Sequence, residues 1–202
     1  TMRASILVLG PLLAKYGRAR IALPGGCAIG SRPVNYHLDA LKELGAVINL
    51  RNGYIEASAK KLIAANIRFP NITVTGTENL MMAASLADGI TTLSNVAMEP
   101  EIVDLADMLN SMGAHVEGAG TNKITIKGVK NLSGTVFDIP ADRIEAGTYL
   151  VAAAVTKGNI TIDGIDPNRL MRVIDKLKNT GAEVEYENNS ISVKMDLESP
   201  NP

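Results

Sequence analysis

The chain has few of the residues that mark several common protein classes. Among its 202 residues there is one cysteine and no tryptophan, and aromatic side chains make up 3%. One cysteine cannot form an internal disulfide bond, which fits a reducing compartment. The sequence therefore favours a cytoplasmic protein over a disulfide-stabilised secreted one.

An excess of charge of one sign is also lacking. The 20 lysines and arginines are balanced by 21 acidic residues, and the formal net charge is −1. Proteins that bind nucleic acids usually carry a basic patch or run, which this sequence does not contain. We therefore expect no polynucleotide partner.

Long hydrophobic runs are absent as well. No apolar stretch approaches the roughly 20 residues of a membrane span, and no charged leader with a cleavage site opens the chain. We expect no membrane association. The 46% hydrophobic content suffices for a substantial core in one or two domains.

The start of the sequence lacks a helix cap. An apolar, helix-like segment over residues 3–14 begins without one, which suggests a fragment of a longer protein.

What the sequence does contain is a threefold internal repeat. Three prolines, each preceded by a polar residue, lie 67 residues apart: Pro33, Pro100 and Pro167. Three Gly-Ala pairs have glycines 68 residues apart: Gly45, Gly113 and Gly181. Two landmarks in one register are hard to obtain by chance, so the sequence predicts three units of about 67 residues.

The third unit shows the expected structure most clearly. Asp166 is a candidate N-cap, and an apolar stripe with helical spacing follows at Leu170, Val173, Ile174 and Leu177. Alternating residues over 183–187 and 190–195 then predict a hairpin. Almost wholly apolar segments at 4–14, 80–87 and 149–155 predict a buried helix before each amphipathic one.

Each unit is therefore predicted to have one buried helix, one amphipathic helix and roughly four short strands. This places the chain in the α/β class, built from α+β repeats. Units of this kind can pack their buried helices together and face their sheets outward.

The first unit carries an insertion that contains the single cysteine. Leu23 and Pro33 are ten residues apart, whereas the corresponding residues of the other two units are seven apart. About three extra residues thus fall on the Pro-Gly-Gly-Cys segment that ends at Cys27. Lone cysteines are most often small buried hydrophobes, but this one has little local core to join. Loops on rigid scaffolds commonly carry function, so we predict a reactive thiol, five residues before Arg32.

This loop carries a resemblance to a known family. The segment Pro24-Gly25-Gly26-Cys27-Ala28-Ile29-Gly30-Ser31-Arg32-Pro33-Val34 closely resembles the bacterial UDP-N-acetylglucosamine 1-carboxyvinyltransferases. The similarity runs from residue 1 to about residue 195. Three further segments add to it: Met2-Arg3-Ala4-Ser5, Thr75-Gly76-Thr77-Glu78-Asn79-Leu80 and Asp142-Arg143-Ile144-Glu145-Ala146-Gly147-Thr148.

The resemblance implies an inside-out α/β prism with two domains of three repeats each. Residues 1–140 would form part of the cysteine-loop, UDP-GlcNAc-binding domain, with repeats at 1–66 and 67–133. Residues 141–202 would be the first repeat of the opposite domain. Family members are about twice as long, so the missing remainder would be a necessary partner, and we expect no turnover from this chain alone.

The implied reaction transfers the enolpyruvyl group of phosphoenolpyruvate to the 3'-hydroxyl of UDP-GlcNAc and releases phosphate, the first committed step of peptidoglycan synthesis. It needs no cofactor or metal. The methylene carbon must be protonated as the hydroxyl attacks, and Cys27 inherits the role of this general acid. The family cysteine also bonds to phosphoenolpyruvate and is alkylated by fosfomycin. A thiol with a pKa of about 8.5 is mostly protonated at neutral pH, and nearby cations would make it a better acid.

The resemblance also assigns substrate-binding residues: Arg3, Arg32, Pro33, Val34, Asn35, Tyr36, Ile72, Thr73 and Val74. The arginines would neutralise phosphate or carboxylate oxygens. Many family members have aspartate where this chain has Asn35, which keeps a carbonyl acceptor but loses the charge. His37 is either a wall of the same pocket or a polar residue at a helix start. The segment Ile72-Thr73-Val74-Thr75 either reaches the diphosphate or belongs to a capping turn with Thr77 as the N-cap.

Other functions remain open from the residues alone. A related enolpyruvyl transferase acting on shikimate 3-phosphate shares the prism fold, without an expected cysteine loop. An RNA 3'-phosphate cyclase uses related repeats but calls for a basic face. A non-catalytic scaffold fragment of three packed repeats is the alternative from a different class.

Overall fold

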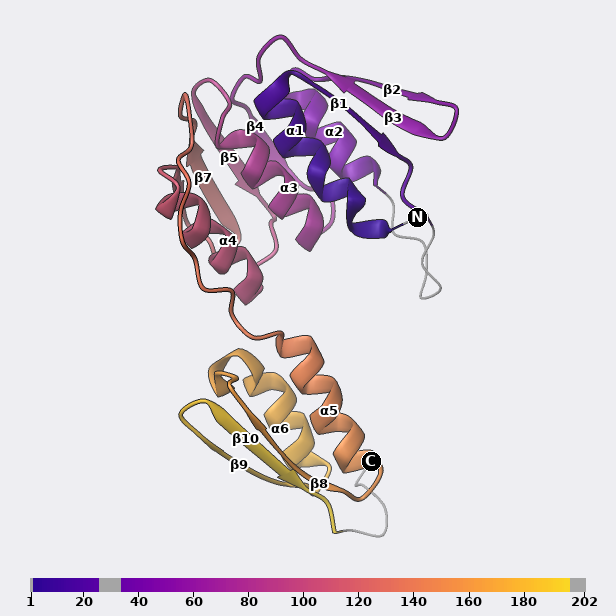
Figure 1. Cartoon of the computed structure of the whole chain (residues 1–202), viewed down its shortest axis with the longest axis vertical. Coiled ribbons are helices and arrows are strands. Elements are labelled where there is room, and N and C mark those ends of the chain that lie inside the picture. The colour runs from indigo at the N-terminus through magenta and orange to yellow at the C-terminus, as the bar shows by residue number, and fades with distance from the viewer. Residues whose placement is uncertain (1, 26–33, 197–202) are drawn as a thin grey trace. The chain divides into compact units, whose positions relative to one another are not determined.

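The computed structural model describes residues 2–25 and 34–196. The chain divides into two compact units, Thr1–Phe137 and Asp138–Pro202 (Figure 1). Three residues predicted for the site, Cys27, Arg32 and Pro33, lie outside the described residues.

The first repeat of the first unit is an apolar helix, a strand, a second helix and a hairpin. Its elements are η1 (Arg3–Val8), α1 (Leu9–Tyr16), β1 (Arg18–Ala22), α2 (Asn35–Glu43), β2 (Val47–Arg51) and β3 (Tyr54–Ser58). The strands form an antiparallel sheet in the order β1-β3-β2. The hairpin turns tightly because Asn52 and Gly53 both adopt positive φ, as a two-residue turn of this kind requires.

The second repeat follows the same plan and adds one strand. Its elements are β4 (Asn66–Arg68), α3 (Val74–Ala84), β5 (Ile90–Ser94), α4 (Pro100–Ser111), β6 (His115–Glu117) and β7 (Lys123–Lys127). The sheet order is β4-β5-β7-β6, with β4 and β5 parallel. The sheets of the other two repeats have three described strands each, against the roughly four predicted.

Helix α3 lies at the centre of the first unit. It packs against η1, α1, α2 and α4, and Figure 1 shows it between α1 and α4. Leu80, Met81, Ala83 and Ala84 are fully buried in a single hydrophobic core. The prediction of a buried helix over 80–87 is therefore confirmed for residues 80–84, where helices from both repeats enclose it, whereas the helix ends at Ala84 and not at residue 87.

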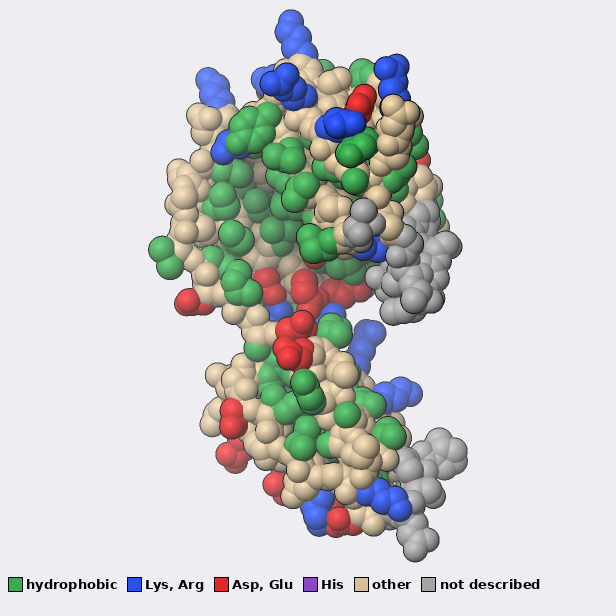
Figure 2. All heavy atoms as spheres, turned by 45° about the vertical axis from the view of Figure 1, so that its right-hand side comes forward, with side chains coloured by type: hydrophobic (Ala, Val, Ile, Leu, Met, Phe, Trp, Pro, Cys, Tyr) green, Lys and Arg blue, Asp and Glu red, His purple; other side chains and the backbone are tan. Residues whose placement is uncertain are grey.

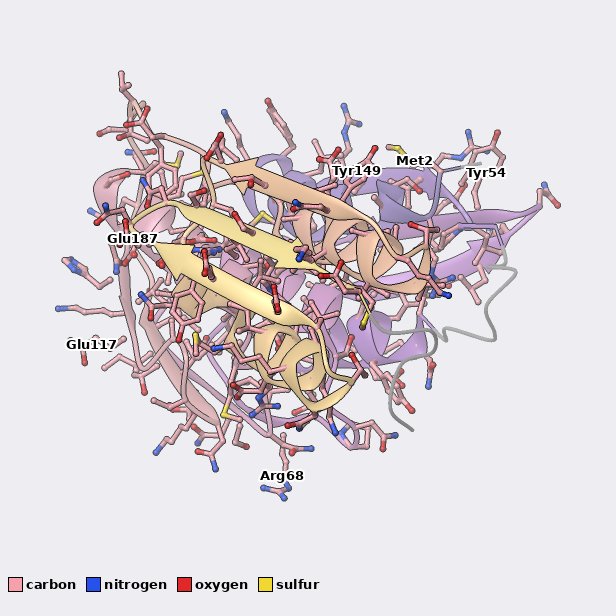
Figure 3. All side chains as sticks on the ribbon, turned by 90° about the horizontal axis from the view of Figure 1, so that it is seen from below. Met2, Tyr54, Arg68, Glu117, Tyr149 and Glu187 are labelled. Atoms are coloured by element: carbon pink, nitrogen blue, oxygen red, sulfur yellow. The ribbon has the colours of Figure 1, made fainter. Side chains whose placement is uncertain are left out.

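The second unit is a single repeat. It contains α5 (Arg143–Val155), β8 (Asn159–Asp163), η2 (Pro167–Leu170), α6 (Met171–Asn179), β9 (Glu183–Glu187) and β10 (Ser190–Lys194). Its sheet, in the order β8-β10-β9, lies in front of the helices in Figure 3, where Glu187 marks the end of β9. Asp166 caps η2 by accepting a hydrogen bond from the backbone N–H of Asn168, as predicted.

The prediction that residues 149–155 form a buried helix is wrong for one face of α5. Leu150 is fully buried, but the exposed fractions of several neighbours are high: Ile144 60%, Tyr149 59%, Val151 44% and Val155 68%. Figure 2 shows hydrophobic side chains at the surface of this unit. The reason is that only one repeat is present, so within this unit η2, α6 and the sheet pack against one side of α5.

None of the helices in the described part of the chain has both the length and the apolar character that a membrane span needs.

Candidate functional site

Arg3 lies beside the start of the cysteine loop. It is the first residue of η1, is half-buried, and donates a hydrogen bond from Nη1 to the carbonyl oxygen of Gly25 at 3.4 Å. Gly25 is the last described residue before the loop that contains Cys27. The predicted substrate-binding arginine is thus held near the segment that carries the predicted general acid.

The other described site residues lie at two helix starts. Val34 occupies the N-cap position of α2, Asn35 opens that helix with an exposed side chain, and Tyr36 is half-buried. Ile72 is exposed, Thr73 is the N-cap of α3, and Val74 is the first residue of that helix. Both predicted segments therefore present residues at the N-termini of neighbouring helices.

The alternative with Thr77 as N-cap is wrong. The N-cap is Thr73, whose Oγ1 accepts a hydrogen bond from the backbone N–H of Gly76 at 3.2 Å. Thr77 lies one turn further along and is fully buried, and its hydroxyl donates to the carbonyl of Thr73. Helix α3 thus begins at Val74, one turn earlier than the alternative with Thr77 as N-cap predicts.

Two side-chain hydrogen bonds join the two segments. Asn71 donates from Nδ2 to the hydroxyl of Tyr36 at 2.7 Å, and Oγ1 of Thr75 lies 3.3 Å from Nε2 of His37. Residues 34–37 and 71–75 are far apart in sequence, yet the fold places them side by side. The structure thus places residues 34–36 beside residues 72–75, two segments that the resemblance assigns to the same ligand.

His37 is a buried member of this arrangement, with 3% of its surface exposed. Its Nδ1 lies 3.1 Å from Nδ2 of Asn79, which is fully buried on α3. The pKa of His37 is lowered from 6.5 to about 4, first by burial of the ring and second by the positive charge of Arg3. The ring is therefore neutral at pH 7 and acts as a hydrogen-bonding group, without a charge of its own.

The described residues offer no candidate metal site. Within residues 2–25 and 34–196, no three or more His, Cys, Asp or Glu side chains are grouped so that they could hold a metal ion.

Glu78, on α3, is a partly buried carboxyl group with acidic neighbours. Burial raises its pKa, and the charges of Glu101 and Glu99 raise it further.

Sequence reasoning missed Asn79 and Asn71 as parts of this site. Asn79 did carry a signal, since an amide in the middle of an otherwise apolar buried helix must find hydrogen-bond partners. Asn71 carried none, because its role depends on a neighbour, Tyr36, that only the tertiary fold supplies.

Comparison with known proteins identifies the family. The family model of EPSP synthase (3-phosphoshikimate 1-carboxyvinyltransferase) matches residues 1–202. The chain belongs to this family. The curated UDP-N-acetylglucosamine 1-carboxyvinyltransferase of Ruthia magnifica subsp. Calyptogena magnifica is 58% identical over 200 residues, which cover 99% of this chain and 48% of that protein. The enzyme of the same name from Geobacter metallireducens is 58% identical over 194 residues, or 96% and 46% of the two chains.

The solved structures support the fold. The enolpyruvyl transferase NikO from Streptomyces tendae matches with a TM-score of 0.80 and 21% identity, over 97% of this chain and 48% of that chain. The predicted α/β enolpyruvyl transferase fold and the resemblance drawn from the cysteine loop are both confirmed. The chain spans about half the length of the curated relatives that it matches.

Proposed function

We propose that this chain carries the cysteine-loop part of a site that transfers the enolpyruvyl group of phosphoenolpyruvate to the 3'-hydroxyl of UDP-GlcNAc. The observation that carries the proposal is that hydrogen bonds of Asn71 with Tyr36 and of Thr75 with His37 join the two described segments, 34–36 and 72–75, that the resemblance assigns to the same nucleotide sugar. Relatives named for this activity are 58% identical over almost the whole chain.

In the proposed reaction the thiol of Cys27 gives its proton to the methylene carbon of phosphoenolpyruvate. The 3'-hydroxyl attacks the adjacent carbon and loses its own proton, which gives a tetrahedral ketal that still holds the phosphate. Loss of a proton from the methyl carbon and of inorganic phosphate then forms the enol ether. Arg3 and Arg32 offset the charge of the phosphate or carboxylate during these steps.

The nucleotide part of UDP-GlcNAc is assigned to the paired helix starts. Residues 32–36 are assigned to the nucleotide part, where the exposed Asn35 offers a carbonyl acceptor for the uracil edge. Ile72, Thr73 and Val74 lie near the diphosphate, since the first N–H groups of a helix have no intrahelical partner and favour anions. Thr73 shapes the helix start by accepting the bond from the backbone N–H of Gly76, and its hydroxyl hydrogen remains available for a diphosphate oxygen.

The domain assignment is part of the same proposal. Residues 1–140 would belong to the cysteine-loop domain and 141–202 to the opposite domain. The boundary between the two compact units, which falls between Phe137 and Asp138 in the sequence, supports this division. The relatives' greater length supports a missing remainder that completes the site. The chain alone should therefore bind UDP-GlcNAc weakly and show no turnover.

The proposed substrates are small molecules, and we infer neither a nucleic-acid nor a membrane partner. The single cysteine and the nucleotide-sugar substrate favour the cytoplasm as the location.

A titration of the ¹⁵N-labelled chain with UDP-GlcNAc, followed by amide NMR shifts, tests the proposal. We expect the largest shifts at residues 34–37 and 71–75, and no such shifts with shikimate 3-phosphate. Asn35→Ala should weaken binding about fivefold, the loss of one hydrogen bond, whereas Asn66→Ala, an exposed asparagine on β4, should not.

Two outcomes of this titration contradict the proposal. Shifts that are confined to the second unit would place the ligand elsewhere. The absence of shifts at saturating UDP-GlcNAc would favour the non-catalytic scaffold, and a response to shikimate 3-phosphate alone would favour the related transferase.

A further inference from the structure

Asn79 makes hydrogen bonds to three different elements from the core of the first unit. The backbone N–H of Gly10, in α1, donates to its Oδ1 at 2.8 Å. Its Nδ2 donates to the carbonyl of Ile6, in η1, at 3.0 Å and lies 3.1 Å from Nδ1 of His37, in α2. All the hydrogen atoms of the side-chain amide are therefore used, and the residue is fully buried.

The two backbone partners fix the orientation of this amide. An N–H group only donates and a carbonyl only accepts, so Oδ1 must face Gly10 and Nδ2 must face Ile6. A reversed amide would place donor against donor and acceptor against acceptor inside the core, where each unpaired group costs about 1–3 kcal/mol.

The amide in turn fixes the state of His37. Nδ2 carries hydrogens and no free electron pair, so Nδ1 of the neutral ring must accept and its proton must reside on Nε2. The Nε2–H group then donates to Oγ1 of Thr75, 3.3 Å away. Because the oxygen of Thr75 accepts this bond, the hydroxyl hydrogen remains available for another acceptor.

Thr75 is exposed and is the last residue of the 72–75 segment that the resemblance assigns to the diphosphate. We propose that Asn79 is a positioning residue, which holds His37 as the Nε2–H tautomer and so directs the hydroxyl hydrogen of Thr75 toward an anionic oxygen of the bound nucleotide. The assignment of the ligand, though not of the tautomer, rests on the proposed function.

The same amide also holds the helix that begins with Arg3. Ile6 and Gly10 lie at the junction of η1 and α1, and η1 begins with Arg3. By bonding to both residues, Asn79 fixes η1 against α3 while it orients the histidine on α2. The side chain of Asn79 thus fixes the positions of η1, α2 and α3 relative to one another.

Long-range ¹H–¹⁵N NMR spectra of the histidine rings test the tautomer directly in the chain at pH 7. Only two histidines are present, and the other, His115, is exposed on β6 and serves as the internal reference. We expect an unprotonated Nδ1 and a protonated Nε2 for His37. Asn79→Asp should place a proton on Nδ1, because a carboxylate only accepts.

Two further variants separate this role from a merely structural one. Ser85→Ala removes another buried polar group of the α3 region, one that donates to the carbonyl of Met81, and should leave the tautomer unchanged. Thr75→Val should also leave it unchanged, because the proton is set from the Nδ1 side. In the UDP-GlcNAc titration, Asn79→Asp should weaken binding about tenfold, and Ser85→Ala less than twofold.

A proton on Nδ1 in the unaltered chain would overturn the proposal, and so would a tautomer that switches in Thr75→Val. These two results need no folded Asn79 variant. A switched tautomer with unchanged affinity in Asn79→Asp would overturn the positioning role. If the unaltered chain shows no response to UDP-GlcNAc, the proposed function and the ligand role of Thr75 fail, while the spectra still decide the tautomer.

Discussion

Gly10→Ala is expected to destabilise the first unit by about 3 kcal/mol. Gly10 lies on α1 where that helix crosses α3, and a Cβ atom added there would overlap Oδ1 of Asn79. The same atom would lie 2.6 Å from the carbonyl oxygen of Asn79 and 3.3 Å from Cβ of Ala83. The gain in helix propensity from alanine, about 1 kcal/mol, cannot offset the separation of two packed helices.

Urea unfolding followed by the amide NMR signals of α1 and α3 measures this effect. Gly134→Ala is the matched control, because Gly134 has no positive φ and an added Cβ would meet nothing within 4 Å. The control should change the free energy of unfolding by less than about 0.5 kcal/mol. Equal stability of the two variants would mean that α1 and α3 do not approach as closely as described.

The stability of the first unit should fall by about 2 kcal/mol between pH 7 and pH 5 through His37 alone. The pKa of this residue is lowered to about 4 in the folded protein, first by burial and then by Arg3, against 6.5 ordinarily. As the pH falls, the unfolded chain therefore binds a proton before the folded one does. The contribution is fully present above pH 6.5 and is lost as the pH falls toward 4.

His37→Gln provides the comparison, because glutamine keeps an acceptor for Asn79 but does not titrate. Urea unfolding at pH 7 and pH 5 should show the smaller loss of stability in the variant. The pKa of Glu78 is raised first by burial and then by Glu101 and Glu99, so this residue makes the free energy of unfolding rise as the pH falls. This effect is the same in both proteins. The difference between them therefore isolates His37, and an identical pH dependence would contradict the burial of its neutral ring.

The repeat and most of its elements were predictable because their signals are local. The stripe that includes Leu170, Ile174 and Leu177 is buried in α6 and η2 as its spacing predicts. Asp166 forms the expected cap. Periodicity identifies which face of a segment is apolar, and that is enough to place helices and hairpins.

The remaining features depend on which partners are present in space. The apolar character of α5 predicted burial, yet Tyr149 and Val155 are exposed because one repeat alone cannot enclose the helix. The network of Asn79, His37 and Gly10 joins residues that are up to 69 positions apart, which no local pattern reveals. The cysteine loop was found by its extra length and its resemblance, and Cys27 lies outside the described residues.

Mass spectrometry after fosfomycin treatment, with and without UDP-GlcNAc, tests the central claim most directly. The chain has one cysteine, so a thiol adduct can form only on Cys27, and Cys27→Ser provides the blank. If this chain carries the cysteine-loop part of the transferase site, an adduct should form on Cys27, and UDP-GlcNAc should accelerate its formation. An inert thiol, or an adduct whose rate of formation does not respond to UDP-GlcNAc, would contradict the account.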